Sequence, residues 1–374
     1  MPDAEKLAAV REALPAVGAG IYLDTPVAGP LPAETARAVA DLEGWELTTG
    51  RVGRDRRDEV VGRIDEARAA VAAILTTDVD AVELTHGLCD ALRCAVAAVA
   101  WRPGDRIVVV EGERVVEIVV PAGVEQSVVE LPSGDDAAIL AAIESVIDDR
   151  TRLIAVPHVS AATGTLLPIE RIARLIHAVG ARLLVDGSLA AGAIPVAVDE
   201  LGADWYAVPA QSWLLGPEGL GALVTVGRRG SGSAVAHEFH LPSVVGFARS
   251  AGWLSMYVGL GWIHDRGSQL TAHTAERLRA IDGVEVLTPA DRQATTLVFR
   301  VAGWSAVTAL EELGRRIFLL ASSVPAVDAI RLGIGWFNTE AELDRLRDGV
   351  ELLARHTPET LPPQRRLAIL GQDA

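Results

Sequence analysis

Short β-branched runs alternate with amphipathic segments over residues 60–226, and this alternation constrains the fold more than any other feature of the sequence. Apolar residues recur with a helical period between these runs, most clearly at 90–101, 135–149 and 168–180. Strands that alternate with helices predict βαβ units around a mostly parallel sheet covered by helices. The expected strands are 81–85, 106–112, 127–131, 152–159, 181–188, 204–210 and 221–226.

The pattern changes near residue 250. A long helical segment near 250–280 is followed by short strands among helices, which is typical of a smaller α+β domain. We therefore predict an N-terminal helical segment over 1–20, a large α/β domain over 21–250 and a small C-terminal domain over 251–374. No Gly/Ser-rich linker separates them, so we expect a fixed interface between the two domains.

The net charge is −16, from 50 acidic and 34 basic residues. This charge repels phosphate backbones and anionic lipid surfaces, so neither nucleic acid nor a membrane is an expected partner. No apolar run approaches the roughly 18 residues of a membrane helix, and residues 1–15 lack the pattern of a secretory signal, so the cytoplasm is expected. Lys6 is the only lysine, so no other position can supply a lysine amine for a Schiff base.

The two cysteines favour ordinary packing roles. Cys89 and Cys94 are five residues apart in a helical segment, and about 500° of rotation turns the two thiols to different faces. HExxH, paired CxxC and P-loop motifs are missing from the sequence, so metal hydrolase and NTPase functions have no support, and no metal site is predicted.

Four loops that follow predicted strands are the expected place of the functional site. They are THGLCD (85–90), PHVSAATG (157–164), DGSLAAG (186–192) and PAQSW (209–213). In parallel sheets ligands bind beyond the carboxyl ends of the strands, where such loops converge. We expect the site there.

Six stretches in this order resemble the class V aminotransferases, which include cysteine desulfurases and isopenicillin N epimerase-like proteins. They are YLDTPVAGPLP (22–32), ELTHGLCDAL (83–92), LIAVPHVSAATGTLLPI (153–169), LLVDGSLAAGAIPV (183–196), AVPAQSWLLGPEGLGAL (207–223) and AIRLGIGWFNTEAELDRL (329–346). The resemblance implies the α/β fold of fold type I pyridoxal phosphate (PLP) enzymes. It also implies a homodimer with active sites at the subunit interface.

The sequence departs from that family at its cofactor contacts. The family normally carries a His-Lys pair before the tryptophan that matches Trp213, and the lysine forms the Schiff base with PLP; here the pair is Gln211 and Ser212. Further family contacts to the phosphate, the ring face and the ring hydroxyl match Leu88, Cys89, Arg114, Leu189, His240 and Leu241. Apolar side chains at such positions would leave a phosphate without donors. The sequence therefore predicts that PLP does not bind covalently and that the chain uses no cofactor.

Four polar residues remain as candidates for chemistry. Asp186 matches the acidic partner of the pyridine nitrogen and is a candidate general base or anchor, or else a helix N-cap. Arg331 matches the arginine that binds the substrate carboxylate, or else forms an ion pair. His158 is an acid/base candidate or a structural histidine, and Ser212 is a nucleophile only if a base lies within reach.

The rest of the expected pocket combines polar and apolar side chains. Arg114 is a second anion-binding group if it points inward, and Cys89 is either a thiol of lowered pKa at a helix start or a small apolar filler. Gln211 and His240 complete the polar candidates. Apolar candidates for a wall that suits an aromatic or polycyclic ligand, or for ordinary core, are Leu88, Leu189, Trp213, Leu241 and Trp336.

These residues leave three functional hypotheses. The first is a PLP-independent enzyme that performs acid/base chemistry on a carboxylate-bearing small molecule, as a lyase, cyclase, isomerase or hydrolase of a biosynthetic pathway. The second is a non-catalytic pseudoenzyme or a regulatory subunit that pairs with an active homologue. The third is a protein that binds PLP or pyridoxamine phosphate non-covalently.

Overall fold

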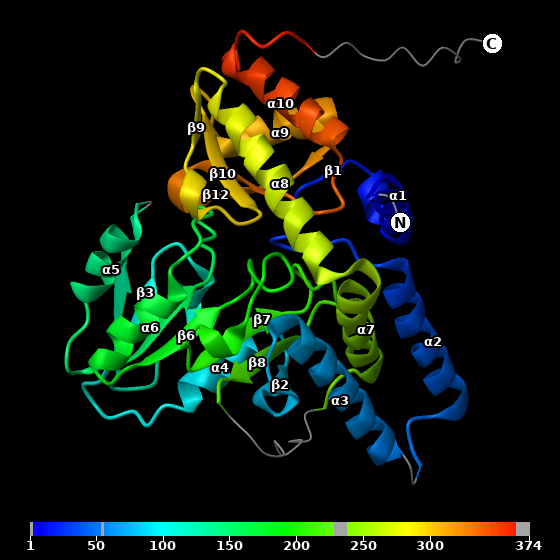
Figure 1. Ribbon diagram of the computed structural model, residues 1–374, viewed down its shortest axis with the longest axis vertical. Coiled ribbons are helices and arrows are strands. Elements are labelled where there is room, and N and C mark those ends of the chain that lie inside the picture. Colours follow the sequence, from blue (N-terminus) through cyan, green and yellow to red (C-terminus); the bar gives the residue numbers. More distant parts are fainter. Residues whose placement is uncertain (1–2, 54–55, 133, 228–237, 364–374) are drawn as a thin grey trace.

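The computed structural model describes residues 3–53, 56–132, 134–227 and 238–363 and has two lobes (Figure 1). The lower lobe in this view is built on a seven-stranded sheet and the upper lobe on a four-stranded sheet. None of the helices in these ranges is long and apolar enough to cross a bilayer.

The seven-stranded sheet confirms the predicted parallel architecture. Its order is β2-β8-β7-β6-β5-β3-β4, and only β8 runs antiparallel to its neighbours. Leu183, Leu184 and Val185 of its central strand are fully buried, as expected where helices cover both faces. The strands are β2 (Val82–Thr85), β3 (Arg106–Val110), β4 (Glu125–Val129), β5 (Thr151–Pro157), β6 (Arg182–Asp186), β7 (Trp205–Pro209) and β8 (Gly221–Thr225).

Two groups of helices cover this sheet. Helices α2 (Ala33–Thr49), α3 (Arg56–Leu75) and α7 (Leu241–Gly252) pack together on the right of Figure 1. Helices α5 (Asp136–Glu144) and α6 (Ile169–Ala178) lie on the left, and α4 (Leu88–Ala97) packs on β2, β6, β7 and β8. The predicted helical segments 90–101, 135–149 and 168–180 correspond to α4, α5 and α6.

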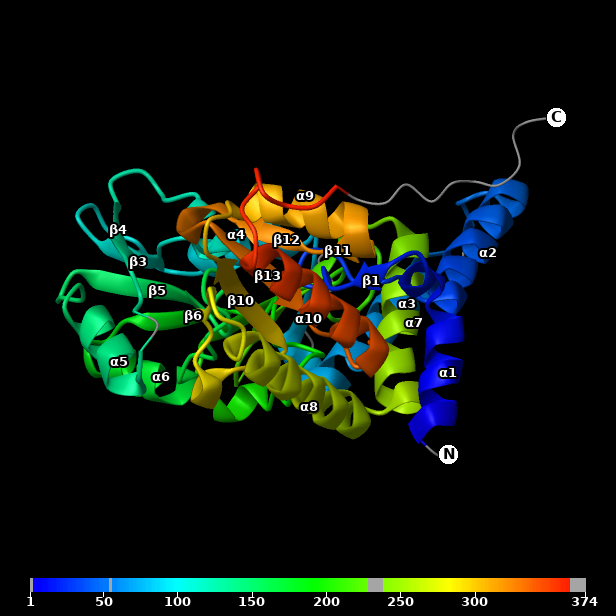
Figure 2. The same cartoon turned by 90° about the horizontal axis from the view of Figure 1, so that it is seen from above.

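The upper lobe has an antiparallel sheet of order β12-β13-β10-β9. Figure 2 shows α8, α9 and α10 around this sheet. Its elements are α8 (Leu260–Arg279), β9 (Val284–Val286), β10 (Thr296–Val301), α9 (Ala306–Ile317), β12 (Ser322–Val324), β13 (Ala329–Gly333) and α10 (Glu340–Ala354). The capping box of Thr339 and Glu342 fixes the start of α10.

Residues 21–23, which follow the N-terminal helix, belong to the upper lobe. Helix α1 (Asp3–Ala13) leads into β1 (Ile21–Tyr22), which pairs in parallel with β11 (Leu319–Leu320). Ile21 and Leu23 are fully buried in the upper core, although the sequence assigned residues 21–23 to the large domain. This alternation of apolar side chains is too short to reveal from sequence which sheet receives it.

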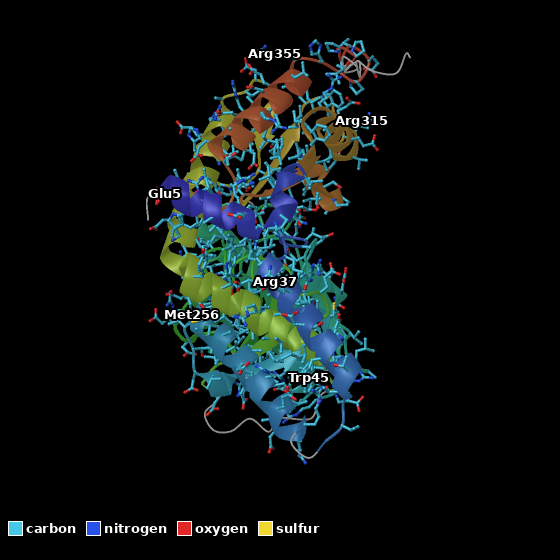
Figure 3. The ribbon with its side chains drawn as sticks, turned by 90° about the vertical axis from the view of Figure 1, so that its right-hand side faces the viewer. Glu5, Arg37, Trp45, Met256, Arg315 and Arg355 are labelled. Carbon is cyan, nitrogen blue, oxygen red and sulfur yellow. The ribbon has the colours of Figure 1, made fainter. Side chains whose placement is uncertain are left out.

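The predicted long helix near 250–280 is interrupted. Helix α7 continues into a π-helical turn over Trp253–Val258, and α8 starts after Gly259, whose φ of 85° suits glycine. Within the turn, Met256 is 85% exposed, and its label in Figure 3 lies at the edge of the molecule. The interruption separates the helix that covers the lower lobe from the one that covers the upper lobe.

Candidate functional site

A cavity of about 190 Å³ opens at the carboxyl ends of three neighbouring strands. Pro157, Asp186 and Pro209 are the last residues of β5, β6 and β7, and all three line it. Arg331 reaches it from β13 of the upper lobe, so we call it the interlobe cavity. The other lining residues are Pro26, Gly112, Glu113, Arg114, Val159, Ala161, Ser188, Leu189 and Ser212.

Asp186 lies at the wall of this cavity, and its carboxylate is buried. It accepts hydrogen bonds from the backbone N–H of Ser188 at 2.8 Å and from the Ser188 hydroxyl. Burial raises the pKa of Asp186, and the Ser188 hydrogen bonds and the charge of Arg114 only partly offset this effect. Asp186 therefore both fixes the turn after β6 and faces the cavity.

His158 does not take the position that an acid/base residue needs. Its Nδ1 is 2.8 Å from the hydroxyl of Tyr206, and the ring is not among the residues that line the interlobe cavity. Burial lowers the pKa of His158 to about 4, so the imidazole is neutral at neutral pH. Tyr206 also passes over Gly187, where an added Cβ would lie 2.1 Å from its ring. His158, predicted as a catalytic residue, thus lies outside the lining of the interlobe cavity and contacts Tyr206.

Glu113 is the site residue that the sequence analysis missed. Its carboxylate accepts hydrogen bonds from Ser160 Oγ at 2.6 Å and from the backbone N–H groups of Ala161 at 2.9 Å and Ala162 at 3.2 Å. Burial raises the pKa of Glu113 to about 7, although these hydrogen bonds oppose the shift. The available signal was the acidic EGE that directly follows β3 at the carboxyl edge of the sheet.

Arg331 and Arg114 both face the interlobe cavity without a protein partner. Among the described residues neither donates a hydrogen bond or lies within 4.0 Å of a carboxylate, and Arg331 Nε is buried without an acceptor. Burial lowers the pKa of Arg331, and Asp24 and Glu113 oppose this shift. The ion-pair alternative for Arg331 therefore loses support. Arg114 is exposed and also lines the cavity.

Ser212, which the resemblance aligns with the family lysine, has a small buried hydroxyl. Ser212 Oγ donates to the backbone oxygen of Pro26 at 3.3 Å, and no described side chain within hydrogen-bond distance of it is a base. Gln211 does not line the cavity; its Oε1 is buried without a donor, and its backbone oxygen accepts from Gly29 at 2.7 Å. Lys6 lies on α1, with its Nζ 4.5 Å from the ring centroid of Trp262.

The predicted aromatic wall is not at the cavity. Trp213 and Trp336 are each 1% exposed and belong to the core, because Trp336 packs between Trp253 and Trp262. Leu88 and Leu241 are likewise buried core residues, so Leu189 is the only predicted apolar residue that lines the described cavity. His240 lies outside it, with its Nδ1 2.8 Å from Ser243 Oγ.

A second cavity of about 350 Å³ adjoins the first, and we call it the outer cavity. Arg114 lines both cavities. Cys89 lines only the outer one, as an exposed free thiol in the first turn of α4. Its remaining walls are His86, Asp90, Leu92, Arg93, Glu117, Ile118 and Val119.

The fold and the place of the site define the class of protein. A mostly parallel sheet with a site at its carboxyl edge and a smaller α+β lobe form the architecture of fold type I PLP enzymes. The chain belongs to the aminotransferase class-V family, whose model matches residues 21–230.

Relatives and solved structures agree with this assignment. A probable cysteine desulfurase of Methanothermobacter thermautotrophicus is 24% identical over 92% of this chain and 97% of the relative. The isopenicillin N epimerase of Streptomyces clavuligerus is 29% identical over 60% of this chain and 65% of the relative. The cystine C-S lyase C-DES, solved with its product cysteine persulfide, superimposes with a TM-score of 0.82 at 19% identity, over 90% of this chain and 99% of C-DES.

A second C-DES structure corrects the cofactor prediction. In this variant a lysine is replaced by alanine, and glycine is covalently linked to the PLP cofactor; the TM-score is 0.81 at 19% identity, over 91% of this chain and 98% of C-DES. A protein of this fold therefore keeps PLP after loss of a lysine. The prediction that the chain uses no cofactor was wrong, because it treated the missing lysine and altered contacts as sufficient to exclude PLP.

Proposed function

We propose that the chain is an enzyme that binds a carboxylate-bearing small molecule in the interlobe cavity and transfers a proton at an atom close to that carboxylate. The observation that supports this most is the presence in one cavity of Arg331, whose guanidinium has no described partner, and Glu113, whose carboxyl group is poised to titrate near neutral pH.

Arg331 is the group that binds the carboxylate. A guanidinium presents parallel N–H donors that match the two oxygens of a carboxylate. Its buried Nε lacks an acceptor, and an unpaired donor in a buried place costs free energy that a bound carboxylate would recover. The side chain comes from β13 of the upper lobe, so a bound ligand would contact both lobes.

Glu113 is the group that moves the proton. A base works best when its pKa is close to the working pH, and burial brings the pKa of Glu113 to about 7. Ser160, Ala161 and Ala162 hold both carboxylate oxygens, so the group is fixed before a ligand arrives. Asp186 is the second carboxyl group of the cavity and anchors an N–H or cationic group of whatever occupies it.

PLP fits the part of the interlobe cavity that Asp186 lines. Asp186, which is buried at the cavity wall, would hold the ring nitrogen, as the resemblance to the family implies. The N-terminus of α4 lies at the adjoining outer cavity, which Cys89 and Asp90 of its first turn line, and would offer backbone N–H groups to a phosphate that reaches this cavity. Bound PLP would supply an electron sink for a carbanion. Ser212 offers no amine for a covalent link, so the chain's own residues would hold the cofactor through polar contacts.

Deuterium exchange tests the proposal whatever the product of the reaction is. The protein would be incubated in D₂O with a panel of amino acids, 2-oxo acids and simple carboxylic acids, with and without added PLP, and ligand masses would be measured. We expect solvent deuterium in at least one compound, at a rate that falls in Glu113→Gln while binding persists. Binding without exchange across the panel would contradict the enzyme and favour a ligand-binding protein.

A further inference from the structure

Several arginines elsewhere on the described surface have carboxylate partners. Arg11 lies 2.7 Å from Glu342, and Arg171 lies 2.7 Å from Asp136. Arg114 differs because it lines the interlobe cavity without such a partner within 4.0 Å among the described residues. A guanidinium held beside buried groups without a partner indicates a place for an anion that the ligand brings.

The charge of Arg114 acts on Arg331 across the cavity. The positive charge of Arg114 contributes to the lowered pKa of Arg331, and Arg114 also acts on Asp186. Among the described residues Asp186 makes no ion pair with Arg114 within 4.0 Å, and its Oδ1 accepts from Ser188. Two guanidinium groups thus share a small cavity in which no described protein acceptor binds them.

The position of Arg114 separates its task from that of Arg331. Arg331 reaches the interlobe cavity from the upper lobe, whereas Arg114 follows β3 of the lower lobe and lines the outer cavity as well. An anionic group bound by Arg114 would therefore sit at the junction of the two cavities. A carboxylate bound by Arg331 would lie in a different part of the interlobe cavity.

We propose that this site binds two anionic groups at once, a carboxylate that Arg331 binds and a second carboxylate or phosphate that Arg114 binds at the junction of the cavities. This inference rests on the proposed function for the role of Arg331 and adds the chemical class of the ligand. The second anion could belong to a dicarboxylic substrate or to the phosphate of PLP, and both offer charged oxygens to the same guanidinium.

Isothermal titration calorimetry distinguishes these cases. Succinate, glutarate and adipate would be compared with butyrate, valerate and caproate, and PLP with pyridoxal, on the wild-type protein and on Arg114→Met. Arg171→Met is the matched control, because it removes the same charge from an exposed position of α6 outside both cavities. Circular dichroism and thermal unfolding would establish that each variant is folded.

We expect at least one dicarboxylate, or PLP, to bind about tenfold or more tightly than its partner that lacks the second anionic group, as one charge-assisted contact predicts. Arg114→Met should remove that preference and weaken monocarboxylate binding far less than it weakens binding of the preferred ligand, whereas Arg171→Met should keep the preference. A preference confined to dicarboxylates assigns the second anion to the substrate, and one confined to PLP assigns it to the cofactor.

Equal affinity for both members of every pair, or an unchanged preference in Arg114→Met, would overturn the inference. Monocarboxylate binding that is lost only in Arg331→Met would then leave the proposed function standing. If no carboxylate binds the wild-type protein, or if Arg331→Met changes nothing, the proposed function fails as well.

Discussion

In the seven-stranded sheet, the charged residues at the amino ends of the strands, here called the amino edge, differ in their partners from those at the carboxyl ends, the carboxyl edge. At the amino edge Asp204, just before β7, accepts hydrogen bonds from Leu183 N at 2.8 Å and His177 Nε2 at 2.9 Å, and it pairs with Arg182. Burial opposes its ionisation, yet these contacts hold the pKa of Asp204 below its usual value. At the carboxyl edge burial raises the pKa of Asp186 despite its Ser188 contacts.

This difference separates structural charges from functional ones. At the amino edge, acids and arginines satisfy each other, as Arg152 and Asp105 do at 3.1 Å. At the carboxyl edge, carboxyl groups of raised pKa face guanidinium groups that lack a described partner. Perturbed titratable groups gathered in a cavity are typical of functional sites, whereas compensated pairs are typical of a scaffold.

The largest expected effect is on catalysis. Glu113→Gln should lower the rate of deuterium exchange by roughly 10²–10⁴-fold, because an amide cannot accept the proton. Ligand affinity should change little, because the amide oxygen can still accept from Ser160. The exchange rate at ligand saturation measures the effect, and a rate within a few-fold of the wild-type rate would show that another group is the base.

Glu113 should also make the free energy of unfolding depend on pH. The pKa of Glu113 rises from 4.5 to about 7 on folding, so its stabilising contribution is full below the unfolded pKa and is lost as pH rises through about 7. At 1.36 kcal/mol per pKa unit, the free energy of unfolding should fall by on the order of 3 kcal/mol more in the wild type than in Glu113→Gln between about pH 4 and pH 8. Urea unfolding across that range gives both curves, and parallel curves would refute the shift.

Ligand affinity should depend on the arginine of the cavity and not on one at the amino edge. Arg331→Met should weaken carboxylate binding by about 10- to 100-fold, from the loss of roughly 1.5–3 kcal/mol of charge-assisted hydrogen bonding. Arg182→Met, at the amino edge, should leave the dissociation constant unchanged. Calorimetric titration of both variants provides the measurement, and equal losses would erase the distinction between the two edges.

Neutralising one aspartate at each edge should affect the free energy of unfolding differently at neutral pH. Asp204→Asn should lower the free energy of unfolding by roughly 1–2 kcal/mol, because it weakens the acceptor for Arg182, His177 and Leu183. Asp186→Asn should leave this free energy unchanged or raise it, since burial disfavours the charged form of Asp186. Chemical denaturation compares them, and a clear loss in Asp186→Asn would contradict this view of the carboxyl edge.

The smallest expected effect concerns the outer cavity. Cys89→Ala should change the free energy of unfolding by less than about 0.5 kcal/mol, because the thiol is exposed and free. Short monocarboxylates should bind as they do to the wild type. A large loss of their affinity would show that the primary ligand extends beyond Arg114 to Cys89.

Much of the fold could be predicted from periodicity and resemblance, because apolar alternation follows from local geometry. The cavity brings together five of the predicted site residues, which lie at strand ends and in loops in the order of the family motifs: Asp186, Arg331, Arg114, Ser212 and Leu189. The start of the upper lobe at residue 21 could not be predicted, because a two-residue strand does not specify its partner.

The errors at the site have a common physical origin. Whether Glu113 is buried depends on a loop that follows another strand, and the direction of the His158 ring depends on Tyr206. Such contacts form between distant segments and leave no local pattern. The cofactor prediction failed for a different reason, since it inferred an empty site from lost side chains in a fold that retains PLP after one lysine is replaced in the C-DES variant.

The pH dependence of deuterium exchange is the measurement that tests the central claim most directly. With a saturating ligand, the wild-type rate should rise with pH and level off with an inflection near the pKa of Glu113, about 7 in the free protein, because the carboxylate form is the base. In Glu113→Gln this inflection should vanish along with most of the rate. An undiminished rate with the same inflection in Glu113→Gln would contradict the account and assign the proton transfer to another group.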